Sequence, residues 1–291
     1  RKSLTMRIKY RHLINYSYPE PVLLGEHRLC IKPRSHGFQN LINFKINIEP
    51  IPNFHYSLIS ASGEEILKTS FEGYTDNLSI EAISEVETFE HPSLNKCLKD
   101  KDLPLPLNRY CMNNDLKGAL EGWLPNGQHD PSAVELSQEA LAGSGDNLIT
   151  YIPQLIEIIQ DRVKYTKRHI GPAWPASRTL KERVGSCRDL AMLMVECTRS
   201  VGIPSRFVSG YHFENHSLSE YELHAWTELY IPNAGWRGFD PSGKGLIDER
   251  YLTLVASSDS NLTAVVKGDF IGSPNLQTDL SWNIKPIEID Y

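Results

Sequence analysis

Three side chains that together could perform nucleophilic catalysis occur in the order Cys187, His224 and Asp240. The histidine follows the cysteine by 37 residues (224 − 187), and the aspartate follows the histidine by 16 (240 − 224). A thiolate is a nucleophile, a histidine can take up the thiol proton, and a carboxylate can orient the histidine ring. These residue types predict acyl transfer through a covalent intermediate.

Cys187 lies at the start of a predicted helix over residues 186–200, which is followed by a glycine and a proline. Free backbone N–H groups and the positive end of the helix dipole favour a thiolate there, and the same N–H groups could bind an oxyanion. A lone cysteine at a helix start is more often a small buried hydrophobic residue, an interpretation that suits Cys197 better. Asp189 is expected to complement the helix dipole.

His224 begins a segment whose alternation predicts a strand, and Asp240 ends the next predicted strand. An antiparallel pair joined by a tight turn brings Asp240 back beside His224. Each residue also has an ordinary structural explanation, because strand histidines are usually hydrogen-bonded and Asp-Pro-Ser-Gly is a good turn sequence. Their common order, at spacings that a sheet can close, favours a catalytic site.

Trp226 and Trp174 are the candidate substrate-binding residues. Trp226 lies two residues after His224, so on a strand both side chains point to the same face, and it is expected to wall the cleft or to fill the core. Trp174 lies in a loop that leads into the helix of Cys187 and is expected to shape the site. His212 and His216 are four residues apart, but they follow a strand within a polar stretch, so no metal site is predicted.

The elements that position these residues fall into two regions. Alternating apolar and polar residues over 8–18 and 42–48 predict half-buried strands, so residues 1–95 are expected to form a β-rich, antiparallel, sandwich-like domain. Residues 96–130 are rich in proline and are expected to be a connector. Residues 131–291 should form the catalytic domain, with a helix over 152–163 and strands at 206–211, 221–231 and 236–240. The predicted fold class is α+β.

Composition excludes several functions. The 291 residues carry 30 Lys+Arg against 36 Asp+Glu, without the basic excess of a nucleic-acid-binding surface. No apolar run approaches the roughly 18 residues that span a bilayer, so neither nucleic acid nor a membrane is an expected partner. Five cysteines without paired spacing predict neither a disulfide scaffold nor a zinc ribbon. A cytoplasmic location is the expectation.

Four blocks of the sequence resemble the bacterial transglutaminase-like proteins, which are often described as candidate cysteine proteases. They are residues 185–189 (Gly-Ser-Cys-Arg-Asp), 202–211, 224–226 (His-Ala-Trp) and 238–242 (Gly-Phe-Asp-Pro-Ser). The first hundred residues are similar to the β-rich region that precedes the core in that family. The resemblance covers residues 6–275 and is specific because the blocks share one order.

The resemblance implies a papain-like core, in which a helix-borne Cys187 packs on an antiparallel sheet that carries His224 and Asp240. It implies a Cys–His–Asp triad that needs no cofactor. The sequence departs from the family pattern after the cysteine, where Arg188 replaces an expected glutamine, and again at residues 248–250 and 257–260. These departures concern substrate contacts more than the nucleophile.

The expected function is that of a cysteine protease or amidase, which hydrolyses a peptide or isopeptide bond of a peptide or protein substrate through a thioester. Water is always present, whereas cross-linking needs a site that shelters the thioester from it. A transglutaminase, which joins a glutamine carboxamide to an amine, is one alternative. A non-catalytic binding module that keeps the fold is the other. The sequence identifies neither the second oxyanion donor nor the oligomeric state.

Overall fold

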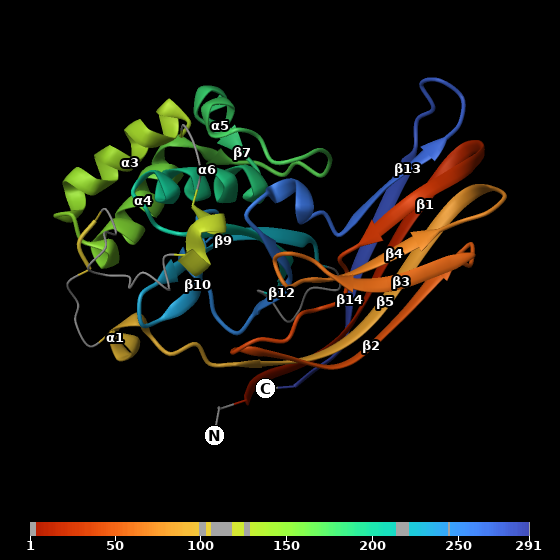
Figure 1. Ribbon diagram of the computed structural model, residues 1–291, viewed down its shortest axis with the longest axis horizontal. Coiled ribbons are helices and arrows are strands. Elements are labelled where there is room, and N and C mark those ends of the chain that lie inside the picture. Colours follow the sequence, from red (N-terminus) through yellow and green to blue (C-terminus); the bar gives the residue numbers. More distant parts are fainter. Residues whose placement is uncertain are drawn as a thin grey trace.

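The computed structural model describes residues 4–98, 103–105, 118–124, 129–213, 221–243 and 245–290. It is an α+β structure in which a helical part and a long curled sheet lie on opposite sides of a second sheet (Figure 1). The strands are β1 (Leu4–Leu29), β2 (Gln39–Glu49), β3 (Phe54–Ile59), β4 (Glu65–Ser70), β5 (Tyr74–Phe89), β6 (Lys164–Tyr165), β7 (Val184–Gly185), β8 (Ser205–His212), β9 (Leu223–Ile231), β10 (Gly235–Asp240), β11 (Gly245–Leu246), β12 (Tyr251–Ser257), β13 (Val266–Ile271) and β14 (Asp279–Asp290). The helices are α1 (Leu94–Cys97), α3 (Pro131–Ser144), α4 (Leu148–Arg162), α5 (Ala176–Glu182) and α6 (Cys187–Ser200), with short 3₁₀ turns at Glu121–Trp123 and Ser260–Leu262.

The curled sheet is built around β1. Its side chains alternate as the sequence predicts: Ile8, Tyr10, His12 and Ile14 are buried, and the residues between them are more exposed. This alternation fixes which face of the strand packs inward. β1 pairs antiparallel with β5 along one edge, and the sheet order is β2-β5-β1-β4-β3. The predicted antiparallel, β-rich region therefore takes the form of one curled sheet.

The last two strands of the chain also join this sheet. β13 and β14 both pair antiparallel with β1, and β14 runs beside it from the Arg7–Asp290 pair to the Ser17–Asp279 pair. Residues 266–290 thus belong by pairing to the first sheet, although the sequence places them in the region 131–291. Strand pairing between chain ends leaves no local signal, because periodicity reports a strand but not its partner.

The second sheet carries His224 on β9 and Asp240 on β10. Its order is β11-β10-β9-β8-β12, and every neighbouring pair is antiparallel. Helix α6 packs against β9 and β8, where the Thr227 hydroxyl donates to the Ala191 carbonyl at 2.9 Å. Helices α3, α4 and α5 cover α6 in turn (Figure 1). In the described part of the chain, no helix has both the length and the apolar character that crossing a membrane requires.

The two sheets share one hydrophobic core. Side chains of β1 such as Met6 and Ile8 belong to the same buried cluster as Tyr211 and Leu252 of the second sheet. The rings of Tyr10 and Tyr211 meet edge to face at 4.9 Å, and a 2.8 Å hydrogen bond joins His12 Nδ1 to the Tyr211 hydroxyl. This packing fixes the curled sheet against the second sheet.

The local elements around the site match the sequence patterns closely. The helix predicted over 186–200 is α6 with Ser186 as its N-cap, and the strands predicted at 206–211, 221–231 and 236–240 are β8, β9 and β10. The predicted helix 152–163 lies within α4 and its C-cap. The predicted connector, 96–130, falls largely outside the described residues, as do Cys111 and His216.

Gly210 on β8 is required for close packing within the second sheet. A Cβ atom there would lie 2.0 Å from the Leu252 carbonyl oxygen and 2.6 Å from Cη2 of the buried Trp226. We expect Gly210→Ala to lower the free energy of unfolding by about 1–3 kcal/mol, because overpacking displaces backbone and an aromatic ring. Urea denaturation measures this. Gly122→Ala, where a Cβ meets no atom within 4 Å, is the control, and equal losses would contradict the packing argument.

Candidate active site

Cys187 is the first residue of α6 and its thiol is half-buried. Ser186 caps the helix, and the short β7 strand before it pairs in parallel with β6 at Tyr165–Gly185. Gly185 permits this tight entry, because a Cβ there would lie 2.8 Å from Leu190 Cδ1. The sequence thus sets Cys187 at a helix N-terminus, where the first backbone N–H groups have no partner within the helix.

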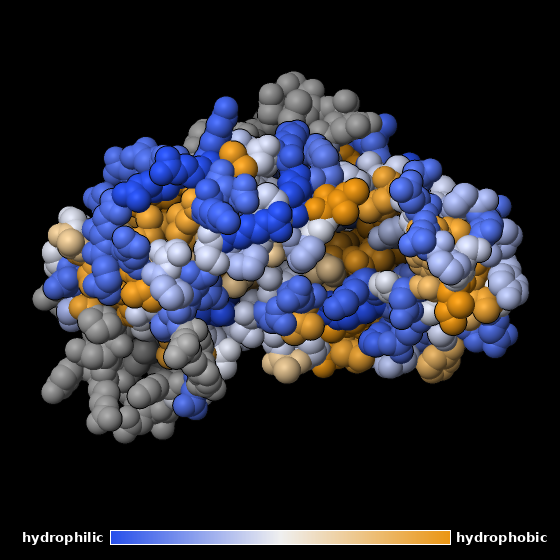
Figure 2. Space-filling view, turned by 90° about the horizontal axis from the view of Figure 1, so that it is seen from above, coloured by the Kyte–Doolittle hydropathy of each residue, from blue (hydrophilic) through white to orange (hydrophobic). Residues whose placement is uncertain are grey.

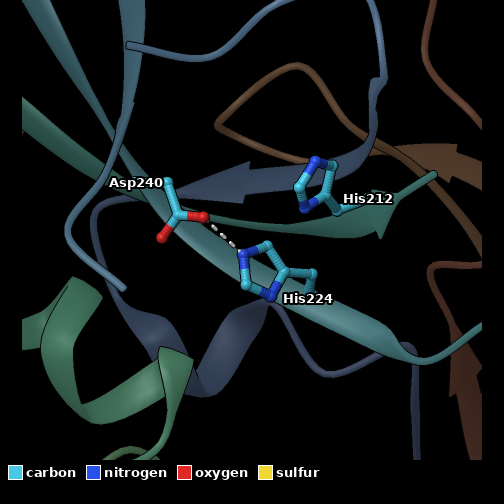
Figure 3. A group of neighbouring side chains, drawn as sticks. All are labelled: His212, His224 and Asp240. Atoms are coloured by element: carbon cyan, nitrogen blue, oxygen red, sulfur yellow. Dashed lines mark hydrogen bonds and ion pairs between the residues drawn. The ribbon is translucent and has the colours of Figure 1, made fainter. Parts of the chain in front are cut away.

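His224 and Asp240 are joined by a 2.7 Å hydrogen bond between Nε2 and Oδ2 (Figure 3). They come from the adjacent antiparallel strands β9 and β10, as the sequence predicts. The carboxylate accepts three further hydrogen bonds: Oδ2 from the Tyr251 hydroxyl at 2.9 Å, and Oδ1 from the N–H and hydroxyl of Ser242 at 2.9 and 2.6 Å. Asp240 is 1% exposed, so these bonds both hold its orientation and stabilise its charge.

The electrostatics of His224 link all three predicted residues. Burial lowers its pKa, but hydrogen bonds to Asp240 and to Cys187, together with the charges of both, outweigh burial and raise the pKa to about 10. Because Nε2 is bound to Asp240, Nδ1 is the nitrogen that can face the thiol. Burial opposes ionisation of Asp240, yet bonds to His224 and Ser242 hold its pKa below the usual value. The arrangement favours an imidazolium that is hydrogen-bonded to the Asp240 carboxylate.

This shift predicts how stability depends on pH. A group whose pKa is raised on folding stabilises the folded state fully below its unfolded value, here 6.5, and loses that contribution as the pH rises through about 10. We expect the difference in unfolding free energy between wild type and His224→Gln to shrink between these two pH values. Urea denaturation across the range measures it, with His55→Gln on the exposed strand β3 as control. A difference that stays constant with pH would contradict the ion-pair assignment.

Asp189 does more than complement the helix dipole. Its side chain is fully buried and accepts hydrogen bonds from the N–H and hydroxyl of Ser186, both at 2.8 Å. It also accepts one from the Trp174 N–H at 2.8 Å and forms an ion pair with Arg168. Although burial opposes ionisation, these bonds hold the pKa of Asp189 below its usual value. One carboxylate therefore fixes both the helix start and the loop before it.

Arg168 stabilises the loop over residues 168–173 by contacts within it. Besides its ion pair with Asp189, its guanidinium donates to the carbonyls of Ile170 and Pro172, each at 2.8 Å. The Trp174 ring packs against the guanidinium groups of Arg168 and Arg178, at 4.7 and 4.0 Å from its centroid. Trp174 thus shapes the site indirectly, by anchoring the loop, and it does not line the cavity described below.

Trp226 lies behind the histidine. Its ring centroid is 6.3 Å from that of His224 and 5.4 Å from that of Tyr251, and its side chain is fully buried. It does not line the cavity beside Cys187. Of the two roles that the sequence allows, packing beneath the histidine is therefore the one that the structure supports.

A cavity of about 430 Å³ opens beside Cys187 and His224. Its walls come from the loop over residues 168–173, from strands β8 and β9, and from β1, β13 and β14 of the curled sheet. Seen from above, it is a hollow with hydrophobic walls between the two halves of the molecule (Figure 2). Tyr165 also lines it, and burial together with the nearby charge of Cys187 raises the pKa of this tyrosine to about 12.

His212 adds a second imidazole to the site. One atom from each of His212, His224 and Asp240 lies within 4.8 Å of the others, which is close enough for a candidate metal site (Figure 3). Both Asp240 oxygens, however, already accept two hydrogen bonds each. A metal ion at this position would compete with the hydrogen bonds that Asp240 already accepts. The His212 ring stacks on Tyr251 at 3.9 Å, and we interpret it as support for that tyrosine.

Tyr251 and Ser242 were not predicted from the sequence as partners of Asp240. The sequence does contain an indication for Ser242, because Asp-Pro-Ser is typical of a turn in which the aspartate side chain accepts a hydrogen bond from the backbone two residues on. Tyr251 had none. It reaches Asp240 from β12, at the far edge of the sheet from β10.

Comparison with known proteins identifies the family. Residues 135–241 match the transglutaminase-like superfamily, and residues 8–87 match the bacterial transglutaminase-like N-terminal region. The chain thus carries a region that matches the transglutaminase-like superfamily, preceded by one that matches the N-terminal region of bacterial transglutaminase-like proteins. The family and the fold together support a cysteine-dependent enzyme.

Similar proteins extend over nearly the whole chain. An uncharacterised protein of Mycobacterium tuberculosis is 22% identical over 314 residues, which cover 98% of this chain and 95% of that protein. A crystal structure from Cytophaga hutchinsonii, described as a candidate cysteine protease, has the same fold, with a TM-score of 0.73 at 19% identity over 100% of this chain and 94% of that chain. A protein-glutamine gamma-glutamyltransferase of Pseudomonas aeruginosa is 36% identical over 67 residues, which are 21% of this chain and 10% of that protein.

Proposed function

We propose that the protein is a cysteine protease or amidase in which Cys187 is the nucleophile, His224 the general base and Asp240 the residue that orients the histidine. The observation that carries this proposal is the 2.7 Å bond between His224 Nε2 and the buried Asp240, placed beside the cavity that Cys187 lines. A nucleophile, its base and an orienting carboxylate in this order are the requirements for covalent catalysis.

The reaction proceeds in two steps. Cys187 gives its proton to His224 and its sulfur attacks an amide carbonyl, while the backbone N–H groups at the start of α6 stabilise the oxyanion. His224 then donates the proton to the leaving amine, which leaves a thioester on Cys187. In the second step His224 takes a proton from water, the resulting hydroxide attacks the thioester, and the carboxylic acid and the thiol are released.

Transamidation is the second candidate, favoured by the local similarity to a protein-glutamine gamma-glutamyltransferase. In that reaction an amine takes the place of water in the second step. Hydrolysis is the simpler outcome, because the cavity opens to solvent between the two halves of the molecule (Figure 2). Ammonia release from glutamine peptides, with and without an added amine, separates the two. Amine incorporation that exceeds hydrolysis would replace the protease assignment with a transglutaminase.

The first test of the nucleophile is alkylation by iodoacetamide between about pH 5 and pH 8, mapped by mass spectrometry. Cys30 and Cys197 are buried, so Cys97, which is half-buried like Cys187, is the internal reference. We expect Cys187 to react faster than Cys97 well below pH 8, and His224→Ala to remove this advantage. If Cys187 reacts no faster than Cys97, the non-catalytic binding module is the better assignment.

A further inference from the structure

The curled sheet supplies a block of apolar side chains to the active-site cavity. Ile14 on β1 pairs directly with Trp282 on β14, and Tyr16 pairs with Leu280. Residues that pair directly across two strands lie on the same face of the sheet, and so do residues two positions apart on one strand. The four side chains therefore form one surface. All four line the cavity that Cys187 and His224 also line.

This block is held in a fixed position relative to the catalytic residues. The Tyr221 N–H donates to the Ile284 carbonyl at 2.8 Å, and Tyr221 precedes His224 by three residues. On the other side, the His169 ring lies 5.4 Å from the Trp282 ring. The curled sheet thus contacts both the strand of the base and the loop that leads to the nucleophile.

The facing wall is also mainly apolar. It includes Ile170, Pro172 and Ala173 of the anchored loop, together with Phe207 of β8. Of the charged residues in this wall, Arg188 is held by a hydrogen bond to the Arg168 carbonyl, and Lys167 is paired with Glu222 at 3.1 Å. The volume of about 430 Å³ lies within the range of roughly 300–1,000 Å³ that is typical of ligand pockets.

We infer that this cavity is a specificity pocket for an apolar, preferably aromatic, group beside the reacting carbonyl of the acyl donor, and that Trp282 and Leu280 determine the preference. The inference rests on the proposed function, because it assigns the cavity to the substrate of Cys187. An aromatic ring of the substrate that binds between Trp282 and the loop over residues 168–173 loses its contact with water on both faces. Burial of one such group is worth roughly tenfold to a hundredfold in binding.

The test compares two alkylating agents that differ only in an apolar group. Iodoacetamide and N-benzyl iodoacetamide present the same reactive carbon to Cys187, and their rate ratio with free glutathione is the reference. We expect wild type to favour the benzyl reagent by about tenfold or more over that reference. Trp282→Ala and Leu280→Asn should return the ratio of the two rates towards the reference. Ile287→Ala, on β14 but outside the cavity lining and 52% exposed, should keep the wild-type ratio.

A binding measurement separates failure of the pocket from failure of the enzyme. Calorimetry on Cys187→Ala with N-acetyl-phenylalaninamide and N-acetyl-alaninamide reports the pocket without any chemistry. We expect the phenylalanine compound to bind at least tenfold more tightly, and Trp282→Ala to abolish the difference. An unreactive thiol together with selective binding would overturn the proposed function and leave the pocket standing. A reactive thiol without a benzyl preference, or no selectivity in binding, would overturn the pocket.

Discussion

Cys187→Ala is expected to abolish acyl transfer and to leave the fold intact. Removal of the nucleophile of a triad lowers kcat by roughly 10⁴-fold or more, because only the oxyanion site and substrate binding are left. The thiol is half-buried at the helix start, where a small apolar side chain is tolerated, so the free energy of unfolding should change by less than about 1 kcal/mol. Turnover of a peptide amide substrate and urea denaturation measure the two effects.

Cys197→Ala is the matched control within the same helix. Cys197 is fully buried in the core beneath α6, and burial raises the pKa of its thiol far above the usual value. The substitution leaves a small void, so we expect it to cost about 1 kcal/mol of stability and to spare activity. If Cys197→Ala removed activity and Cys187→Ala removed only stability, the nucleophile would be wrongly assigned.

Asp189→Ala is expected to have the largest effect on stability, lowering the free energy of unfolding by about 3–5 kcal/mol. The substitution leaves the Arg168 guanidinium, which is 19% exposed, without its buried counter-charge. It also leaves the N–H groups of Ser186 and Trp174 without an acceptor. Because the same carboxylate holds the helix start, labelling of Cys187 should lose its advantage over Cys97 as well. Urea denaturation and the alkylation assay measure both.

Asp248→Ala provides the comparison for that result. Asp248 is also paired with an arginine, Arg250, but its side chain is 35% exposed, and partly exposed pairs contribute about 0–1 kcal/mol. Equal losses from the two variants would show that the Asp189 cluster does not organise the loop. A stable Asp189→Ala protein with normal labelling would do the same.

The sequence predicts the local elements well because their signals are local. The alternation from Ile8 to Ile14 identifies β1, and the helical stripe from Ile152 to Val163 identifies α4. The juxtaposition of His224 and Asp240 also follows, since a short turn between two antiparallel strands leaves little freedom in register.

What could not be predicted depends on contacts between distant segments. The return of β14 to β1 and the reach of Tyr251 to Asp240 join residues from different parts of the chain. Neither is visible in periodicity, because both depend on how the two sheets pack. The burial of Trp226 is of the same kind, since alternation gives the face of the strand and not what covers that face.

The pairing of β1 with β14 has a consequence for the order in which the protein forms. Arg7 and Asp290, which pair in the sheet, are 283 positions apart in the sequence (290 − 7), and contacts so far apart in sequence are slow to form. We therefore expect the wall that Leu280 and Trp282 give to the cavity to form late in folding. Because Cys187 precedes β14 in the sequence, a chain synthesised only as far as α6 would carry the thiol without this wall.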